Sequence, residues 1–181
     1  MVFAQLSQCQ KVYLNKDIKS LFFLYINIKI VHTNNGDNMK ENINALDEIN
    51  KGTTMGMEAI EQIKDKISSE RFRKVIDKQY EDYKRIYEKI SEIYKEYNDK
   101  KEPHEIGTMT KVMTWYDLNV KMMMDNSDSK LAEVLLKGTN MGIIEGKKIY
   151  NNKKLDENVV KIVDEYINMQ EQIVEDLKEF L

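Results

Sequence analysis

Apolar residues recur every three or four positions along most of the sequence from residue 41 onward, which is the spacing of one face of an α-helix. The pattern predicts long helices at about residues 41–67, 70–98, 129–150 and 157–180, and a short helix at about residues 108–124. Residues that break helices are scarce, with one proline and seven glycines among 181 residues. This scarcity favours an all-α fold.

Short connections between neighbouring helices predict how they pair. Ser69 and Asp156 stand directly before the second and fourth long helices, where a side-chain oxygen can accept a hydrogen bond from a free N–H of the first turn. Few residues separate the first helix from the second, or the third from the fourth. Each pair must therefore form an antiparallel hairpin, and residues 99–128 form a long connection between the two hairpins.

Each long helix carries one face with alternating spacings of three and four, as bundle packing requires. These four faces predict the core, which we expect to contain Leu46, Ile49, Thr53, Gly56, Ile60, Ile63 and Ile67; Arg73, Ile76, Tyr80, Tyr83, Tyr87, Ile90 and Tyr94; Ala132, Leu135, Thr139, Gly142, Gly146 and Ile149; and Val160, Val163, Ile167, Gln170, Val174, Leu177 and Leu181.

The two hairpins resemble each other in sequence. The segment NKGTTMGMEAI (residues 50–60) matches LKGTNMGIIEG (136–146) at an offset of 86, and KVIDKQYEDYKRIYEKI (74–90) matches KIVDEYINMQEQIVEDL (161–177) at an offset of 87. Two matches at nearly the same offset indicate an internal duplication.

Two duplicated helical hairpins joined by a long crossover resemble the four-helix bundle of the ferritin-like superfamily. The KGTxMG segments are similar to small bacterial ferritin-like proteins of unknown function. The resemblance covers about residues 42–181 and implies an antiparallel four-helix bundle. Di-iron members of the superfamily bind metal through Glu and Glu-x-x-His residues. This chain contains no Glu-x-x-His, and its only histidines are His32 and His104, so no metal ligand is carried over from that motif.

One polar residue from each helix falls near the middle of the predicted bundle: Thr53, Tyr83, Thr139 and Gln170. Ferritin-like proteins hold their metal at about this level, but hydroxyl and amide groups are weak metal ligands. The layer is interpreted as a hydrogen-bonded layer that sets the register of the helices, with a small ligand pocket as the alternative.

Glycines recur on the inward faces of the first and third helices, at Gly52, Gly56, Gly138, Gly142 and Gly146. We expect them to make room for tyrosine rings, those of the first helix facing the region 80–87 and Gly142 facing Tyr166. A close backbone approach to a ligand is the alternative.

Three carboxylates flank the predicted inward faces: Glu48, Asp82 and Glu145. In the alternative in which the protein binds metal, these three carboxylates form a degenerate all-carboxylate site for iron or manganese. They do not obey the duplication and fall at different heights, so the main expectation is that no cofactor is bound.

Composition narrows the classes of partner. Charged residues make up 33% of the chain with a net charge of −3, so the basic face of a nucleic-acid-binding protein is not expected. The apolar run of residues 21–31 contains Lys29 and is shorter than the roughly 20 residues of a membrane span, so no membrane association is expected. We expect a cytoplasmic, non-catalytic bundle that acts through protein–protein or self-association, with metal binding as the alternative.

The codons for the residues just before Met39 could form the ribosome-binding sequence of a gene that starts at Met39. Residues 35–39, Asn-Gly-Asp-Asn-Met, can be encoded by a purine-rich ribosome-binding sequence followed by a start codon. Residues 1–38 are therefore interpreted as upstream translation or a disordered segment, and residues 39–181 as the folded domain.

Overall fold

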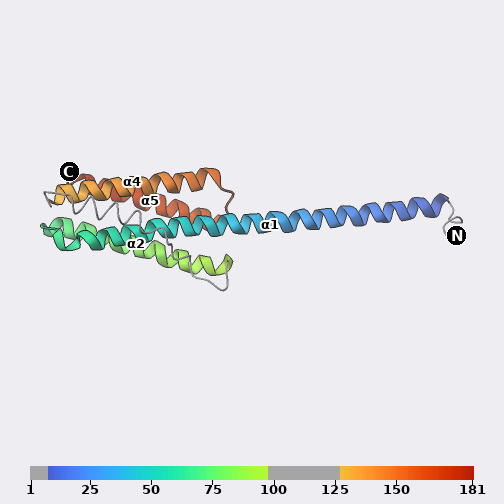
Figure 1. The fold of residues 1–181 in the computed structure, drawn as a ribbon, viewed down its shortest axis with the longest axis horizontal. Coiled ribbons are helices and arrows are strands. Elements are labelled where there is room, and N and C mark those ends of the chain that lie inside the picture. The colour runs from blue at the N-terminus through green and yellow to red at the C-terminus, as the bar shows by residue number, and fades with distance from the viewer. Residues whose placement is uncertain (1–7, 98–126) are drawn as a thin grey trace. The chain divides into compact units, whose positions relative to one another are not determined.

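The computed structural model describes residues 8–97 and 127–181, with side chains from residue 36 onward. The described residues form only helices: α1 (Gln8–Ile63), the 3-10 turn η1 (Lys64–Lys66), α2 (Glu70–Tyr97), α4 (Asp128–Asn152) and α5 (Glu157–Lys178) (Figure 1). The four predicted long helices are confirmed, although α1 begins far upstream of residue 41. The predicted short helix at 108–124 lies outside the described residues.

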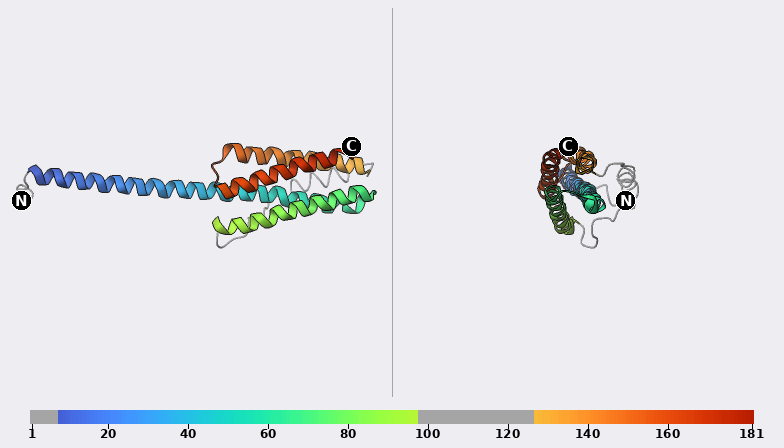
Figure 2. Two further views of the ribbon diagram at one scale, coloured as in Figure 1. Left: turned by 180° about the vertical axis from the view of Figure 1, so that it is seen from behind. Right: turned by 90° about the vertical axis from the view of Figure 1, so that its left-hand side faces the viewer.

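The chain divides into two units, Met1–Met39 and Lys40–Leu181. The second unit is an antiparallel four-helix bundle, in which α1 and α2 form one hairpin and α4 and α5 the other (Figure 2). None of the described helices contains a stretch long and apolar enough to cross a membrane.

Polar contacts join the hairpins at both ends of the bundle. At one end, the Asp128 carboxylate in the first turn of α4 accepts hydrogen bonds from the backbone N–H groups of Ser68 and Ser69, both at 3.0 Å. At the other end, the Tyr97 hydroxyl donates to Asp156 at 2.9 Å, and the Asp156 N–H donates to Asn42 Oδ1 at 2.9 Å. These contacts connect residues that are far apart in the sequence.

The two predicted N-caps differ in their chemistry. Ser69 caps α2 as expected, because its Oγ accepts a hydrogen bond from the Phe72 N–H at 3.1 Å. Asp156 stands at the N-cap position of α5, but its side chain makes no capping hydrogen bond. That part of the prediction is wrong, since the Asp156 carboxylate binds the Tyr97 hydroxyl.

The core follows the predicted faces most closely on α1 and α4, where every predicted aliphatic residue is buried. On α2 the buried stripe includes Phe72 and Ile86, whereas Tyr87 is 37% exposed. Arg73 instead donates hydrogen bonds to the carbonyls of Lys64 and Ile67, which closes the turn before α2. The predictions that Arg73, Tyr87 and Leu181 lie in the core are therefore wrong.

The physical reason is that a tyrosine and its apolar neighbour can exchange roles with little change in helix geometry. The hydroxyl of Tyr87 is hydrated on the surface, and the Ile86 side chain loses no hydrogen bond when it is buried. An α-helix has 3.6 residues per turn, whereas a strict seven-residue repeat corresponds to 3.5. Positions that follow the repeat therefore drift away from the core along a long helix.

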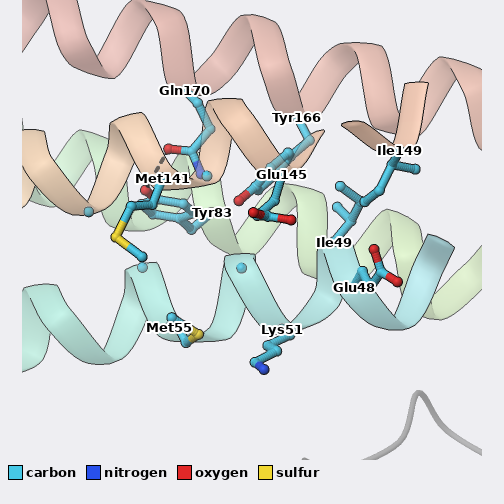
Figure 3. A pocket seen from close by; sticks show the side chains of 14 residues that line it. Glu48, Ile49, Lys51, Met55, Tyr83, Met141, Glu145, Ile149, Tyr166 and Gln170 are labelled. Atoms are coloured by element: carbon cyan, nitrogen blue, oxygen red, sulfur yellow. Dashed lines mark hydrogen bonds between the residues drawn. The ribbon is translucent and has the colours of Figure 1, made fainter. Parts of the chain in front are cut away.

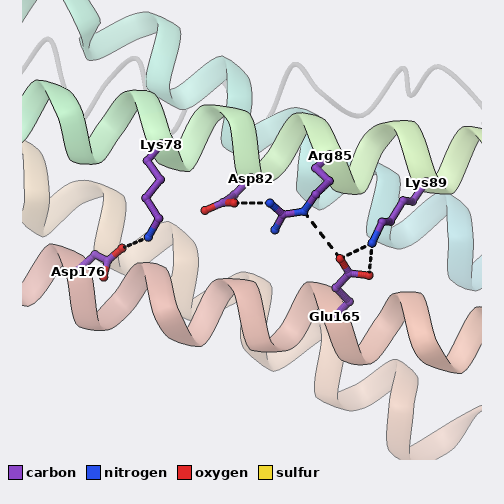
Figure 4. Close-up of polar contacts among 6 residues, drawn as sticks. All are labelled: Lys78, Asp82, Arg85, Lys89, Glu165 and Asp176. Atoms are coloured by element: carbon purple, nitrogen blue, oxygen red, sulfur yellow. Dashed lines mark hydrogen bonds and ion pairs between the residues drawn. The ribbon is translucent and has the colours of Figure 1, made fainter.

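Ion pairs line the outer edge of the contact between α2 and α5 (Figure 4). Lys89 Nζ lies 2.6 Å from Glu165 Oε1, and Arg85 pairs with Asp82 at 2.8 Å and, more distantly, with Glu165. Exposed pairs of this kind contribute about 0–1 kcal/mol each. Asp82 therefore belongs to a strip of surface charge, and its side chain is held by an arginine of its own helix.

Candidate functional site

A pocket lies in the middle of the bundle and takes side chains from all four helices (Figure 3). Its volume is about 530 Å³, within the usual range of about 300–1,000 Å³ for small-molecule sites. The lining is mostly apolar and comes mainly from α1 and α4, with α2 and α5 supplying three polar side chains. The lining residues are Glu48, Ile49, Lys51, Gly52, Met55, Gly56, Tyr83, Gly138, Met141, Gly142, Glu145, Ile149, Tyr166 and Gln170.

The four residues of the predicted polar layer are all buried, with exposed fractions of 5% or less. The Tyr83 hydroxyl donates a hydrogen bond to Gln170 Oε1 at 3.0 Å, and the Thr139 side chain lies close to the same hydroxyl. Thr53 and Thr139 each donate to the carbonyl four residues earlier in their own helix, those of Ile49 and Leu135. The layer thus joins α2 and α5 through the Tyr83–Gln170 hydrogen bond, while Thr53 and Thr139 each donate within their own helix.

Burial raises the pKa of Tyr83 from 10.0 to about 12, although the nearby Thr139 hydroxyl and the hydrogen bond with Gln170 oppose this increase. A buried phenolate would lose its hydration, so the low polarity of the surroundings favours the neutral hydroxyl. At neutral pH Tyr83 is therefore a hydrogen-bond donor to Gln170.

The glycines of α1 and α4 bring the helix backbones close to these polar side chains. A Cβ at Gly56 would overlap the Tyr83 ring, and a Cβ at Gly52 would overlap the Tyr166 hydroxyl. The expectation that Gly52 faces the region 80–87 is wrong, because its neighbour Tyr166 belongs to the other hairpin.

The glycines of α4 lie against α5. A Cβ at Gly142 would be 2.7 Å from Gln170 Nε2 and 2.8 Å from the Tyr166 hydroxyl, as the expected pairing of Gly142 with Tyr166 requires. A Cβ at Gly146 would meet Ile167 Cγ1 at 2.7 Å. Gly138 contributes to the pocket lining.

The three candidate carboxylates do not converge on one point. Glu48 and Glu145 line the pocket, and each is paired with a lysine at its rim, Glu48 with Lys153 at 2.9 Å and Glu145 with Lys148 at 2.7 Å. Asp82 lies on the α2–α5 surface described above. Within the described part of the chain, no group of three or more His, Cys, Asp or Glu residues is arranged to hold a metal ion. The hydroxyl and amide groups at mid-bundle do not fit the carboxylate-rich centre of a di-iron protein.

Sequence reasoning did not identify the apolar walls of the pocket. Met55 and Met141 lie beside Gly56 and Gly142, and Ile49 and Ile149 were assigned only to the core. Adjacency to an inward glycine is a signal that could have found both methionines, because a missing side chain leaves space beside its neighbours.

Comparisons with known proteins bear on the fold. No family model and no curated protein matches the sequence. Among solved structures, the bacterioferritin-related protein of Bacteroides fragilis, described as a dodecameric thioferritin, aligns with a TM-score of 0.60 over 79% of this chain and 85% of that chain, with 13% sequence identity. This chain therefore has a ferritin-like fold. At 13% identity the likeness extends to the fold alone.

Proposed function

We propose that this protein is a non-catalytic ferritin-like bundle that acts by associating with other copies of itself. The observation that carries the proposal is an apolar outer surface on α4, where Met141 and Ile144 are 54% and 53% exposed. Large apolar side chains at neighbouring positions of one helix are typical of a surface that a partner covers. The structural neighbour is described as a dodecamer, which supports self-association as the form of assembly.

The polar layer supports the non-catalytic part of the proposal. The level at which a ferritin-like protein would place carboxylate ligands here carries Thr53, Tyr83, Thr139 and Gln170, and the Tyr83–Gln170 hydrogen bond joins two of them directly. Buried polar contacts of this kind restrict how helices can pack against one another. The layer would thus keep the α4 surface in one defined arrangement for assembly.

Sedimentation velocity of the purified protein tests the proposal. We expect a species that is a multiple of 21.4 kDa, and we expect Ile144→Glu to convert it to the monomer because a charge replaces a buried apolar contact. Asn168→Glu is the matched control, since Asn168 is an exposed residue on α5, away from the α4 surface. A monomeric parent protein at its highest soluble concentration would exclude self-association.

Metal binding is the competing function, favoured by the position of Glu48 and Glu145 on the same pocket. Metal analysis of protein from iron- and manganese-supplemented cells separates the two functions. Stoichiometric metal that is lost in both Glu48→Gln and Glu145→Gln would replace the proposal with a carboxylate metal site. We expect no stoichiometric metal.

A further inference from the structure

We infer that the mid-bundle pocket binds an uncharged, mainly apolar small molecule with a carbonyl oxygen, and that the Gln170 amide nitrogen recognises this oxygen. The inference goes beyond self-association, because it rests on the polar end of the pocket at Gln170. The two proposals share Met141, which lines the pocket and is also exposed on α4.

The first step concerns the Gln170 side chain. Gln170 is 2% exposed, and its Oε1 is occupied by the Tyr83 hydroxyl, which also fixes the orientation of the amide. Its Nε2 has no hydrogen-bond partner among the described residues and belongs to the pocket lining (Figure 3). A ligand oxygen placed there could accept a hydrogen bond from this N–H, and the apolar walls of the pocket would shield that bond from water.

The second step concerns access to that nitrogen. Position 142 carries no side chain, and a Cβ there would be 2.7 Å from Gln170 Nε2. Gly142 therefore leaves the amide nitrogen open on the side of α4. The same Cβ at position 142 would be 2.8 Å from the Tyr166 hydroxyl. The polar end of the pocket is therefore compact, and most of the remaining wall is apolar.

The third step concerns the charge and shape of the ligand. The apolar walls consist of Ile49, Met55, Met141 and Ile149. Thioether groups pack favourably against aromatic rings. The rim carboxylates Glu48 and Glu145 are each paired with a lysine, and the Lys51 side chain points away from the interior (Figure 3), so these charged groups lie at the rim rather than at the Gln170 end. These features together favour an uncharged aromatic carbonyl compound.

Two matched probes test the inference. Benzophenone and diphenylmethane have nearly the same shape, but only benzophenone has a carbonyl oxygen. We expect benzophenone to bind once per chain and about threefold to tenfold more tightly than diphenylmethane, the factor that one neutral hydrogen bond contributes. Titration calorimetry measures both affinities.

Variants locate the site. Gln170→Leu should remove the preference for benzophenone, whereas Gln172→Leu, an exposed position on the same helix, should retain it. Met141→Trp should weaken both probes by filling the pocket from its edge. Asn168→Trp is its control, because Asn168 is exposed on α5 and does not line the pocket. The Met141 pair keeps the test valid even where Gln170→Leu disturbs folding, which circular dichroism reports.

Photolabelling supplies an independent readout. Irradiated benzophenone inserts its carbonyl carbon into a nearby C–H bond, with the hydrogen transferred to the carbonyl oxygen, so mass spectrometry can map the adduct. We expect adducts at Met55 or Met141. No measurable binding, equal affinity for the two probes, insensitivity to Met141→Trp, or adducts confined to other residues would each overturn the inference.

Discussion

At the scale of single residues, the glycine at position 56 tests the packing of α1 against α2. In an exposed helix, Gly→Ala stabilises by about 0.4–1 kcal/mol, but overpacking a core typically costs about 1–3 kcal/mol. A Cβ at Gly56 would overlap the buried Tyr83 ring, so we expect Gly56→Ala to lower the melting temperature. Gly142→Leu should lower it further, because its larger side chain meets both Gln170 and Tyr166.

Gly36 supplies the control for this test. It also lies within α1, but a Cβ there would meet nothing within 4 Å. Gly36→Ala should leave the melting temperature unchanged or raise it. A higher melting temperature for Gly56→Ala would show that α1 does not face Tyr83 at this point.

A second prediction at this scale concerns the Tyr83 hydroxyl. Tyr83→Phe leaves Gln170 Oε1 without its donor, so we expect a loss of about 1–3 kcal/mol in the free energy of unfolding at pH 7. The raised pKa of Tyr83 makes its contribution to the free energy of unfolding depend on pH. This contribution is complete below about pH 10 and is lost as the pH rises towards about 12, because the tyrosine of the unfolded chain releases its proton at a lower pH.

The difference in the free energy of unfolding between the parent protein and Tyr83→Phe should therefore become smaller above pH 10. Urea unfolding at pH 7 and at pH 11 measures it. Tyr87→Phe serves as the control, since Tyr87 is 37% exposed and should show a small effect at both pH values. A difference that widens at alkaline pH would contradict the assignment of Tyr83 as a buried donor.

At the scale of elements, Asp128 connects the η1–α2 turn to the first turn of α4. Burial alone would raise the pKa of Asp128, but hydrogen bonds from the side chain of Ser69 and from the backbone and side chain of Ser68 lower it. Asp128→Asn should destabilise the bundle by about 1–3 kcal/mol at pH 7, because hydrogen bonds to a charged acceptor are replaced by weaker ones.

The pH dependence follows from the direction of the shift. A lowered carboxyl pKa stabilises the folded state above the unfolded-state value of about 3.9, and this stabilisation is lost as the pH falls through the folded-state pKa. The difference in the free energy of unfolding between the parent protein and Asp128→Asn should therefore become smaller below pH 4. Asp164→Asn, at an exposed position on α5, should change stability little at either pH.

At the scale of the whole molecule, the unit Lys40–Leu181 contains every buried residue of the described core. We expect a chain that starts at Met39 to retain the melting temperature of the 181-residue chain, because no described core contact is removed. Differential scanning calorimetry of the two chains makes the comparison. A clearly lower melting temperature for the shorter chain would show that residues before Met39 stabilise the bundle.

The predicted duplication also concerns the whole molecule. Thr53 and Thr139, at matching positions in the two hairpins, donate to matching carbonyls at 2.8 and 2.9 Å. Tyr83 and Gln170 also match each other in the repeat, and they are joined across the bundle by a hydrogen bond. These positions are the ones that the sequence match pairs, and the duplication itself stays a prediction. Two repeated positions, each used twice, supply the four residues of the polar level.

The sequence by itself determined the helices, their pairing and most of the core, because helix periodicity and short connections depend on neighbouring residues. Even the polar layer could be listed in advance, since each seam carries one polar residue at the same height. The sequence could not choose between Ile86 and Tyr87 for the core, because both fit spacings of three and four.

Only the tertiary structure decided which residues meet across the two hairpins. Asp128 with Ser68, Tyr97 with Asp156, and Gly52 with Tyr166 are separated by at least 59 positions, and no local pattern relates them. The pocket, too, was decided only by the tertiary structure. Its space exists because glycines on α1 and α4 face side chains of α2 and α5 at one level, and that alignment depends on how four helices pack together.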